Sequence, residues 1–283
     1  MGTLGLVAGS GRLPAELAAS ARRAGWRVVA VGLVELADPQ LARHVDAFEW
    51  AHVGDFGRLF EVLQAAGAVD VALAGKVPKT FLWERRDVVR PDARALAALA
   101  KLGDRRDDSL LGAVVQVIEA EGLLVRSQLE LAPDLCAAAG VFGSVRPTRA
   151  QEEDVAFGWP IAKALGALDV GQSVVVQGKA VLALEAVEGT DRAIERGIQL
   201  AEPGRGVALV KVAKPAQDPR FDVPTVGLAT LRTLAKGGAG VLAVEARLTL
   251  VLEREALVAE ANAAGIALLG VDGRLLAGAE GRA

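Results

Sequence analysis

The chain alternates short apolar runs with longer segments in which apolar residues recur at helical spacing. Residues 4–8, 27–34 and 69–74 form short apolar runs of the kind that make buried strands. An Ala-rich stretch with a proline near its start follows the first run and closes at Gly25, and a helical pattern covers residues 56–66. Strands that alternate with helices in this way predict βαβ units and a parallel sheet.

The helical pattern resumes over residues 92–122, and residues 123–125 indicate one more strand. Residues 132–147 then lose periodicity and collect two prolines and two glycines, a composition typical of a linker. The sequence therefore predicts an N-terminal domain over residues 1–131, a linker over residues 132–147 and a C-terminal domain over residues 148–283.

The second half of the chain opens with a helical pattern over residues 151–165. Two apolar runs, residues 173–176 and 180–186, flank a short Gln-Gly-Lys turn and predict a β-hairpin. Helical and strand patterns then alternate to about residue 269. The expected fold class is α/β in two domains, each with its own sheet.

Composition limits the kind of protein this can be. Of its 283 residues 52% are hydrophobic, and 32 Lys and Arg against 35 Asp and Glu leave a net charge of −3, which describes a globular chain without a basic surface for nucleic acid. The single cysteine, Cys136, excludes an internal disulfide and a cysteine metal cluster and fits a reducing compartment. With no apolar run near the roughly 18 residues of a spanning helix and no signal-peptide layout, the chain is expected to be cytoplasmic.

The chain is poor in some of the usual catalytic side chains. It has no tyrosine, which excludes Tyr–Lys dehydrogenase chemistry, and His44 and His52 are its only imidazoles. The two histidines stand in a segment that reads as a connecting region, and Cys136 is expected to be inert. If the chain is an enzyme, Asp, Glu, Lys, Ser, Thr and backbone groups must carry most of its chemistry.

The first candidate site is the loop Gly9, Ser10 and Gly11, which follows the first predicted strand and leads into a helix. Backbone N–H groups in such a turn, together with the helix dipole, make an anion site. A dinucleotide fingerprint would require a third glycine where Pro14 stands, so a nicotinamide role is disfavoured. Contact with an anion or nucleotide and a purely structural turn both remain open for this loop.

Two acidic segments precede predicted helices. Asp107 and Asp108 are paired carboxylates that suit either Mg²⁺ or a helix cap. Glu188, Gly189, Thr190 and Asp191 follow the hairpin and precede a helix, where a cap is expected and where α/β proteins also hold phosphates.

The densest group of polar residues lies in residues 211–227. This loop holds two of the eight lysines in an otherwise Arg-rich chain, Lys211 and Lys214, and a retained lysine indicates that a compact point charge is needed. Three prolines between positions 215 and 224 stiffen the loop and hold Asp218 and Asp222 nearly fixed. A rigid loop with polar groups makes a good site, and a solvated charged loop is the alternative.

Six motifs, taken together and in order, resemble the LpxI family. They run from the first strand almost to the end of the chain: residues 9–14, 75–79, 107–111, 168–172, 185–191 and 211–227. Members of that family are UDP-2,3-diacylglucosamine pyrophosphatases of lipid A biosynthesis. The resemblance implies an N-terminal domain with a Rossmann-like parallel sheet and a distinct C-terminal α/β domain. Residues 81–90 and 142–146 match no family pattern.

The resemblance implies Mg²⁺-dependent hydrolysis of the diphosphate of UDP-2,3-diacylglucosamine to UMP and 2,3-diacylglucosamine 1-phosphate, by attack of water on phosphorus. The essential aspartate of the family motif Gln-Asp-x-Arg-x-Asp-x-Pro falls on Asp222. The expected catalytic residues are Asp222, Lys211, Lys214 and Asp218, and the expected metal ligands are Asp222, Asp107 and Asp108. The expected substrate-binding residues are Gly9, Ser10, Gly11, Gln172, Glu188, Gly189, Thr190, Asp191, Gln217, Arg220 and Thr225.

A second hypothesis is a non-catalytic protein that binds nucleotide sugars or lipids. The diacyl substrate and product are the expected partners, and nucleic acid is not. The sequence leaves open whether the chain forms a homo-oligomer and whether it contacts the cytoplasmic face of the inner membrane. Residues 79–86 mix apolar and basic side chains that suit anionic headgroups, although a helix that packs Trp83 inward is as good an interpretation.

Overall fold

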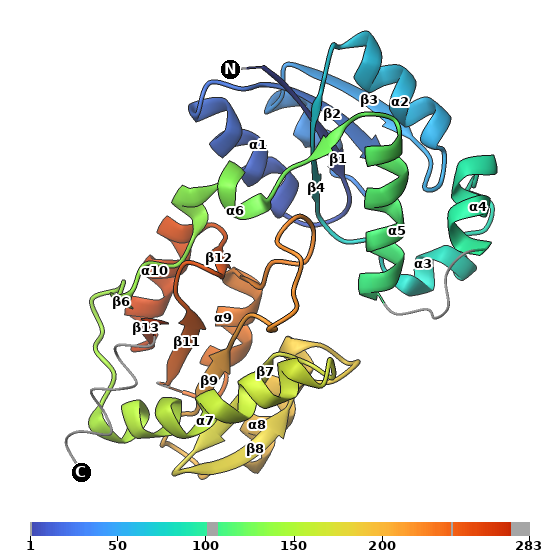
Figure 1. The fold of residues 1–283 in the computed structure, drawn as a ribbon. Coiled ribbons are helices and arrows are strands. Elements are labelled where there is room, and N and C mark those ends of the chain that lie inside the picture. The colour runs from blue at the N-terminus through green and yellow to red at the C-terminus, as the bar shows by residue number, and fades with distance from the viewer. Residues whose placement is uncertain (1, 101–106, 239, 273–283) are drawn as a thin grey trace. The chain divides into compact units, whose positions relative to one another are not determined.

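The computed structural model describes residues 2–100, 107–238 and 240–272, and for residues 79, 83 and 107–109 it describes the backbone alone. The chain divides into two compact units (Figure 1). Unit 1 consists of residues 1–134 and 218–222, and unit 2 consists of residues 135–217 and 223–283. Each unit has its own sheet, which confirms the α/β fold class.

The strands of unit 1 form a single parallel sheet. Its spatial order is β3 (Ala47–Ala51), β2 (Arg27–Leu33), β1 (Thr3–Ala8), β4 (Asp70–Ala74) and β5 (Leu124–Val125). The order 3-2-1-4-5 is that of the doubly wound dinucleotide-binding fold. The Rossmann-like N-terminal domain is therefore confirmed.

Helices cover both faces of this sheet (Figure 1). Leu63 on α2 (Phe56–Ala65) is fully buried and packs so closely over β1 that a Cβ on Gly5 would lie 2.4 Å from its Cδ2 atom. The side chain of Asp55 caps α2 by accepting a hydrogen bond from Arg58 N at 3.0 Å. The helical elements of unit 1 are α1 (Leu13–Arg23), η1 (Pro39–Arg43), α2 (Phe56–Ala65), α3 (Lys79–Glu84), α4 (Ala93–Ala100), α5 (Asp107–Ala120) and α6 (Gln128–Leu131), with η2 (Pro133–Leu135) at its end.

Unit 2 contains a mixed sheet. Its strands lie in the order β6 (Gly140–Val141), β13 (Ala267–Val271), β11 (Val241–Glu245), β9 (Ala208–Lys211), β7 (Ser173–Gln177) and β8 (Ala180–Leu184). The central strands β13, β11 and β9 are parallel, whereas β6 and β7 pair antiparallel with their neighbours and β7 and β8 form the predicted hairpin. A second, short parallel pair joins β10 (Thr225–Val226) and β12 (Leu250–Val251).

Two apolar layers sandwich the larger sheet of unit 2. The long helix α7 (Arg149–Ala167) packs on one face, where a Cβ on Gly158 would lie 2.9 Å from the side chain of Val176. Its start is fixed by a capping box between Thr148 and Gln151. The other face is covered by α8 (Thr190–Leu200), α9 (Leu228–Ala235) and α10 (Arg254–Ala263).

The periodicity found most of these elements, with three differences. The helical stretch at residues 92–122 comprises two separate helices, α4 and α5. Strand β3 falls in the segment that reads as a connecting region, and residues 132–147 contain η2 and the sheet strand β6. No helix in the described part of the chain is long and apolar enough to cross a membrane.

Candidate functional site

Many of the polar residues singled out in the sequence gather in two places, one in each unit, and the others lie apart from both. In unit 2 they surround the carboxyl end of β9, and in unit 1 they lie on residues 218–222, which we call the strap. Carboxyl ends of strands are where α/β proteins bind ligands.

The group in unit 2 centres on a buried lysine. Lys211, the last residue of β9, is 7% exposed, and its Nζ donates to Thr190 Oγ1 at 3.0 Å. Thr190 Oγ1 in turn donates to Glu185 Oε1 at 2.9 Å, and both Thr190 and Glu185 are buried. A buried ammonium group linked through a hydroxyl to a buried carboxylate is stable only as a connected network.

The position of this network depends on a close approach between the backbone at Gly171 and that at Glu185. A Cβ on Gly171 would lie 2.2 Å from the carbonyl oxygen of Glu185, so these two segments can meet only because residue 171 is glycine. Gln172 N then donates to Glu185 Oε2 at 3.3 Å, and Val212 N donates to Gln172 O at 3.0 Å. The loop before β7 is thereby tied both to β8 and to the end of β9.

Lys214 and Gln217 continue this group beyond β9. Lys214 Nζ lies 2.8 Å from Asp169 Oδ1, and its backbone N–H donates to Gln217 Oε1 at 2.9 Å. Gln217 Nε2 reaches Gln172 Oε1 at 3.4 Å. Gln172, Thr190, Lys211, Lys214 and Gln217, all predicted site residues, thus lie in one connected set.

Sequence reasoning missed one ion pair beside this set. Lys163 on α7 binds both oxygens of Glu245, at 2.7 and 2.6 Å, and also donates to Ala213 O at 3.1 Å. Ala213 N donates to Glu245 Oε2 at 2.7 Å, so the pair clamps the backbone between the two loop lysines. The spacing of 82 residues between the partners leaves no local signal in the sequence.

Other predicted residues of unit 2 are engaged elsewhere. Glu188 pairs with Arg196, which also donates to Leu184 O at 2.6 Å, and Asp191 Oδ1 accepts from Thr230 Oγ1 at 2.9 Å. Thr225 Oγ1 donates to Val223 O at 3.1 Å. Gly189 adopts a φ of 84° directly before α8, a conformation that favours glycine. Thr190 therefore joins the Lys211 network, while Glu188 and Asp191 serve local structure.

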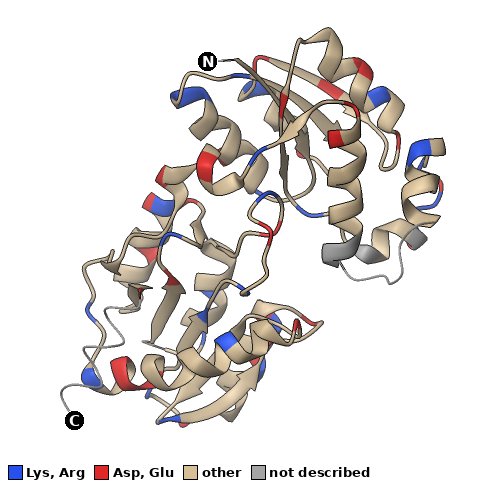
Figure 2. Cartoon of the chain, viewed as in Figure 1, with Lys and Arg blue, Asp and Glu red and all other residues tan. Residues whose placement is uncertain are grey.

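The strap is organised by an internal salt bridge. Arg220 Nε lies 3.0 and 3.1 Å from the two oxygens of Asp218, and Arg220 Nη2 lies 2.7 Å from Asp218 Oδ2. These bonds from Arg220 hold the pKa of the Asp218 carboxyl below its ordinary value, although partial burial acts the other way. Figure 2 shows basic and acidic residues side by side on this loop.

The strap is also bound to the rest of unit 1. Arg220 Nη1 donates to Glu119 Oε1 at 2.8 Å, and Gln128 N donates to Pro219 O at 2.9 Å. Phe221 packs against the core cluster formed by α2, α5 and the sheet. Asp222 N donates to Asp218 O at 2.9 Å, and Asp222 Oδ2 is shielded from solvent. The loop that carries Asp222 is therefore rigid in its own unit.

The glycine loop of unit 1 is occupied by internal contacts. Gly9 N donates to Ala74 O at 2.8 Å, and Ser10 and Lys76 exchange backbone hydrogen bonds of 2.9 Å. A Cβ on Gly9 would lie 2.7 Å from Lys76 O, so glycine is required by the close approach of β1 and the loop after β4. The amides of Gly9 and Ser10 thus support the structural interpretation of this turn.

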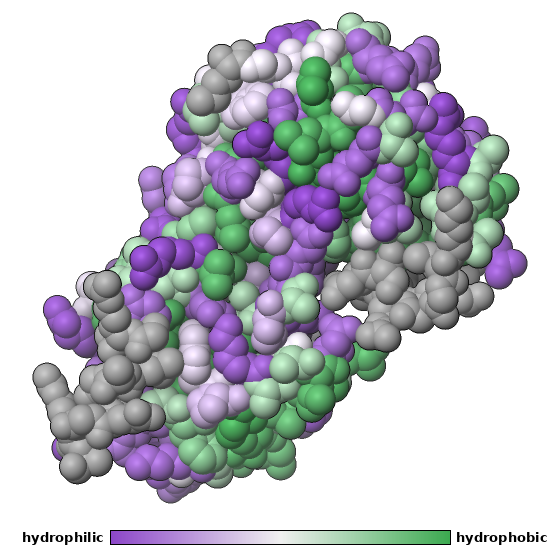
Figure 3. Space-filling model, in the orientation of Figure 1, coloured by the Kyte–Doolittle hydropathy of each residue, from purple (hydrophilic) through white to green (hydrophobic). Residues whose placement is uncertain are grey.

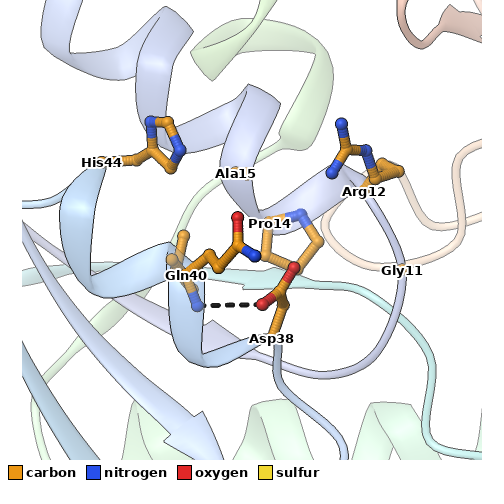
Figure 4. Close-up of a pocket in the computed structure, with 8 residues that line it drawn as sticks. Gly11, Arg12, Pro14, Ala15, Asp38, Gln40 and His44 are labelled. Carbon is orange, nitrogen blue, oxygen red and sulfur yellow. Dashed lines mark hydrogen bonds between the residues drawn. The ribbon is translucent and has the colours of Figure 1, made fainter.

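A small cavity lies beside Gly11. It has a volume of about 30 Å³ and is lined by residues that include Arg12, Asp38, Gln40 and His44. Figure 4 shows His44 and Gln40 pointing toward the start of α1, with Asp38 accepting a hydrogen bond from Gln40 N at 2.9 Å. This volume is close to that of one water molecule.

The predicted metal ligands were Asp222, Asp107 and Asp108. The side chains of Asp107 and Asp108 lie outside the part that the structure describes, although α5 begins at Asp107. Among the residues that the structure does describe, no three His, Cys, Asp or Glu side chains are close enough to hold a metal ion. Both oxygens of Asp218 are bound by Arg220, and Asp222 is the other carboxylate of the strap.

Comparison with known proteins identifies the family. The model of the LpxI N-terminal domain matches residues 3–135, and the model of the LpxI C-terminal domain matches residues 138–269. The chain belongs to the LpxI family. One curated LpxI, the UDP-2,3-diacylglucosamine pyrophosphatase of Caulobacter vibrioides, is 37% identical over 281 residues, which cover 96% of this chain and 98% of that protein.

Solved structures give weaker likenesses to this LpxI-family chain. The Bordetella bronchiseptica enzyme WbmG in complex with NAD and UDP is 15% identical, with a TM-score of 0.27 over 42% of this chain and 34% of that chain. A GalE-like L-threonine dehydrogenase from Cupriavidus necator is 22% identical, with a TM-score of 0.27 over 43% and 34%. At these scores the likeness bears on neither the fold nor the function.

Proposed function

We propose that this protein hydrolyses the diphosphate of UDP-2,3-diacylglucosamine to UMP and 2,3-diacylglucosamine 1-phosphate in lipid A biosynthesis. The observation that carries the proposal is its membership of the LpxI family, together with 37% identity along nearly the whole length of a UDP-2,3-diacylglucosamine pyrophosphatase. The composition agrees, because hydrolysis of a phosphoanhydride can be run by aspartate and lysine in a chain with two histidines and no tyrosine.

The strap supplies the acid group in this proposal. Asp222 is half-buried, and the backbone bond to Asp218 O and the packing of Phe221 fix the loop around it. A carboxylate in such a setting can accept a hydrogen bond from an attacking water and orient it toward phosphorus. We assign Asp222 this role and assign Asp218 and Arg220 the support of the loop, because their charged groups bind one another.

The lysines of unit 2 supply positive charge. The diphosphate of the substrate is anionic, and a unit charge pair at 4 Å interacts by roughly 4 kcal/mol at an effective dielectric constant near 20. Lys211 is held by Thr190 and Lys214 by Asp169, so both ammonium groups have fixed positions. Fixed cations stabilise developing charge on phosphate oxygens without reorganisation during the reaction.

We further propose that Mg²⁺ is the cofactor, with Asp222 as its protein ligand. Mg²⁺ is commonly held by one or two carboxylates together with waters and substrate phosphates, and Asp222 places one carboxylate on the strap. The bound ion would neutralise charge on the diphosphate. Loss of turnover on chelation, with restoration by Mg²⁺, tests this part of the proposal.

The decisive experiment supplies purified protein with UDP-2,3-diacylglucosamine and follows UMP and the lipid product by mass spectrometry. We expect turnover by the wild type and almost none by Asp222→Asn, with the variant still folded and still able to bind substrate. Tight binding by the wild type without release of UMP at any Mg²⁺ concentration would instead support a non-catalytic lipid-binding protein. Normal turnover by Asp222→Asn would exclude the role assigned to that residue.

We also propose that the protein meets its substrate at the cytoplasmic face of the inner membrane. Each buried methylene of an acyl chain contributes about 0.8 kcal/mol, so a diacyl substrate stays in the bilayer. Unit 2 exposes Leu168, Val170 and Val187, with Val187 fully exposed, next to the point where Gln172 N binds Glu185. Figure 3 shows apolar surface over this end of unit 2, where α7, β7 and β8 lie in Figure 1.

A further inference from the structure

The strap belongs to unit 1, although the residues on both sides of it belong to unit 2. Only five residues, 218–222, make this excursion, and the last of them is Asp222. Whatever holds the strap to unit 1 therefore also fixes the position of Asp222.

Three contacts with described residues of unit 1 hold the strap. Pro219 is bound through its carbonyl by the backbone of Gln128, and Phe221 is held by apolar packing. The charged contact is made by Glu119 near the end of α5, whose Oε1 accepts from Arg220 Nη1 at 2.8 Å. Among the residues that the structure describes, Glu119 is the side chain that joins the strap to a helix by an ion pair.

Arg220 transmits this contact through the loop. Its guanidinium binds Glu119 on one side and both oxygens of Asp218 on the other. Asp218 Oδ1 also accepts from Arg220 N at 3.0 Å, and Asp218 O accepts from Asp222 N at 2.9 Å. A continuous set of bonds therefore runs from Glu119 through Arg220 and Asp218 to the backbone of Asp222.

We propose that Glu119 is a positioning residue for Asp222. It holds the guanidinium of Arg220, and through it the strap, so that the Asp222 carboxylate keeps the position required for hydrolysis. This inference rests on the proposed function, because it gives Asp222 a reaction to serve. A misplacement of about 1 Å in a catalytic group can lower the rate by roughly a hundredfold, so a modest shift of the strap is measurable.

Unit 1 offers a matched control two residues away. Glu121, just after α5, binds Arg94 with a distance of 2.9 Å between Arg94 Nε and Glu121 Oε1. Its side chain is 29% exposed and that of Glu119 is 38% exposed, so both pairs are near the surface. Glu121→Ala removes a similar ion pair in the same region without touching the strap.

The experiment measures kcat, KM and hydrogen exchange for the full-length wild type, Glu119→Ala, Glu119→Gln and Glu121→Ala, with UDP-2,3-diacylglucosamine as substrate. We expect Glu119→Ala to lower kcat roughly tenfold while KM changes less than about twofold. Glu119→Gln keeps an oxygen that can accept from Arg220 and should recover kcat to within about threefold of the wild type. Glu121→Ala should have the kcat and KM of the wild type.

Hydrogen exchange separates this proposal from the proposed function. The amides of residues 218 and 220–222 should exchange faster in Glu119→Ala than in Glu121→Ala or the wild type, whether or not the substrate is the right one. If the wild type shows no turnover but the variants show this exchange pattern, the proposed function and the catalytic part of the inference are wrong. The conclusion that Glu119 anchors the strap would still hold. Turnover of Glu119→Ala equal to that of the wild type, or unchanged strap exchange, would overturn the positioning role.

Discussion

Arg220 Nη1 lies 2.8 Å from Glu119 Oε1, across 101 positions of sequence. The bond joins a loop in the second half of the chain to a helix in the first half, and both partners lie in unit 1. The loop that carries Asp222 is consequently part of the N-terminal fold. The predictions below follow from this arrangement and from the network around Lys211.

Phe221 is the apolar anchor of the strap. Phe221→Ala removes a half-buried ring that packs against the core of unit 1, and should lower the free energy of unfolding by about 1–3 kcal/mol. Urea denaturation measures the change. Phe221→Leu keeps most of the apolar volume and should recover stability to within about 1 kcal/mol of the wild type. Equal losses in the two variants would show that apolar packing is not what the ring contributes.

Lys211 should affect both stability and turnover. Lys211→Met leaves buried Thr190 and Glu185 without the ammonium group and should cost about 1–3 kcal/mol of unfolding free energy. Adding Glu185→Gln removes the buried charge and should restore part of that loss, while UMP release stays low. The control is Lys236→Met, a side chain that is 63% exposed and pairs with Glu195 at 3.5 Å, for which a change below about 0.5 kcal/mol is expected.

Acid should weaken the Asp218–Arg220 bridge. The pKa of Asp218 is lower in the folded protein than in the unfolded chain, where it is about 3.9, because Arg220 binds the carboxylate. Its contribution is therefore complete above the unfolded pKa and is lost as pH falls through the folded pKa. The stability difference between the wild type and Asp218→Asn should be constant from about pH 7 to about pH 5 and shrink below about pH 4. A difference that is independent of pH would refute this assignment.

Replacement of two glycines by alanine should change the stability of the protein in opposite directions. Gly171→Ala puts a Cβ 2.2 Å from Glu185 O and should destabilise unit 2 by roughly 2 kcal/mol or more, since backbone must move. Gly112 lies inside α5 with open space around its Cβ position, so Gly112→Ala should stabilise the protein by about 0.5–1 kcal/mol. Thermal denaturation of both variants checks the pair, and a stable Gly171→Ala protein would contradict the close approach.

Membrane contact should depend on the exposed apolar residues of unit 2. Leu168→Glu combined with Val187→Glu should reduce binding to vesicles of anionic lipid severalfold, because two exposed apolar side chains become charged. Leu200→Glu changes a residue that is 67% exposed at the end of α8 and is the matched control. Vesicle flotation measures the bound fraction. Equal binding by the double variant and the control would place the contact elsewhere.

Much of the fold was predictable from local patterns. Apolar runs marked the strands that are buried on both faces, and the Gln-Gly-Lys turn marked the hairpin of β7 and β8. Strand β3 was missed because it lies at the edge of the sheet, where Glu49 and Trp50 are exposed and the apolar run is broken. Edge strands need less hydrophobic sequence, and so they give a weaker signal.

The candidate site was predictable only in part. Residue type and motif order pointed to Lys211, Thr190 and Asp222, because each lies in a short polar motif at or near the end of a predicted strand or the start of a predicted helix. Glu119 and the Lys163–Glu245 pair gave no signal, since each is a lone charged residue until the fold brings its partner close. The partners in these contacts are about 80 to 100 positions apart in the sequence, so only the tertiary structure shows that they meet.

The discontinuity of unit 1 has a consequence for how the protein is made. Residues 1–134 leave the ribosome long before Phe221, which completes the packing of their core. At roughly 5–20 residues per second, synthesis of the intervening chain takes on the order of 4–17 s. Through that interval the core of the N-terminal unit lacks the half-buried ring that packs against it, and the arrival of Phe221 also brings Asp222 to the unit. Completion of unit 1 and placement of the strap are thus the same event.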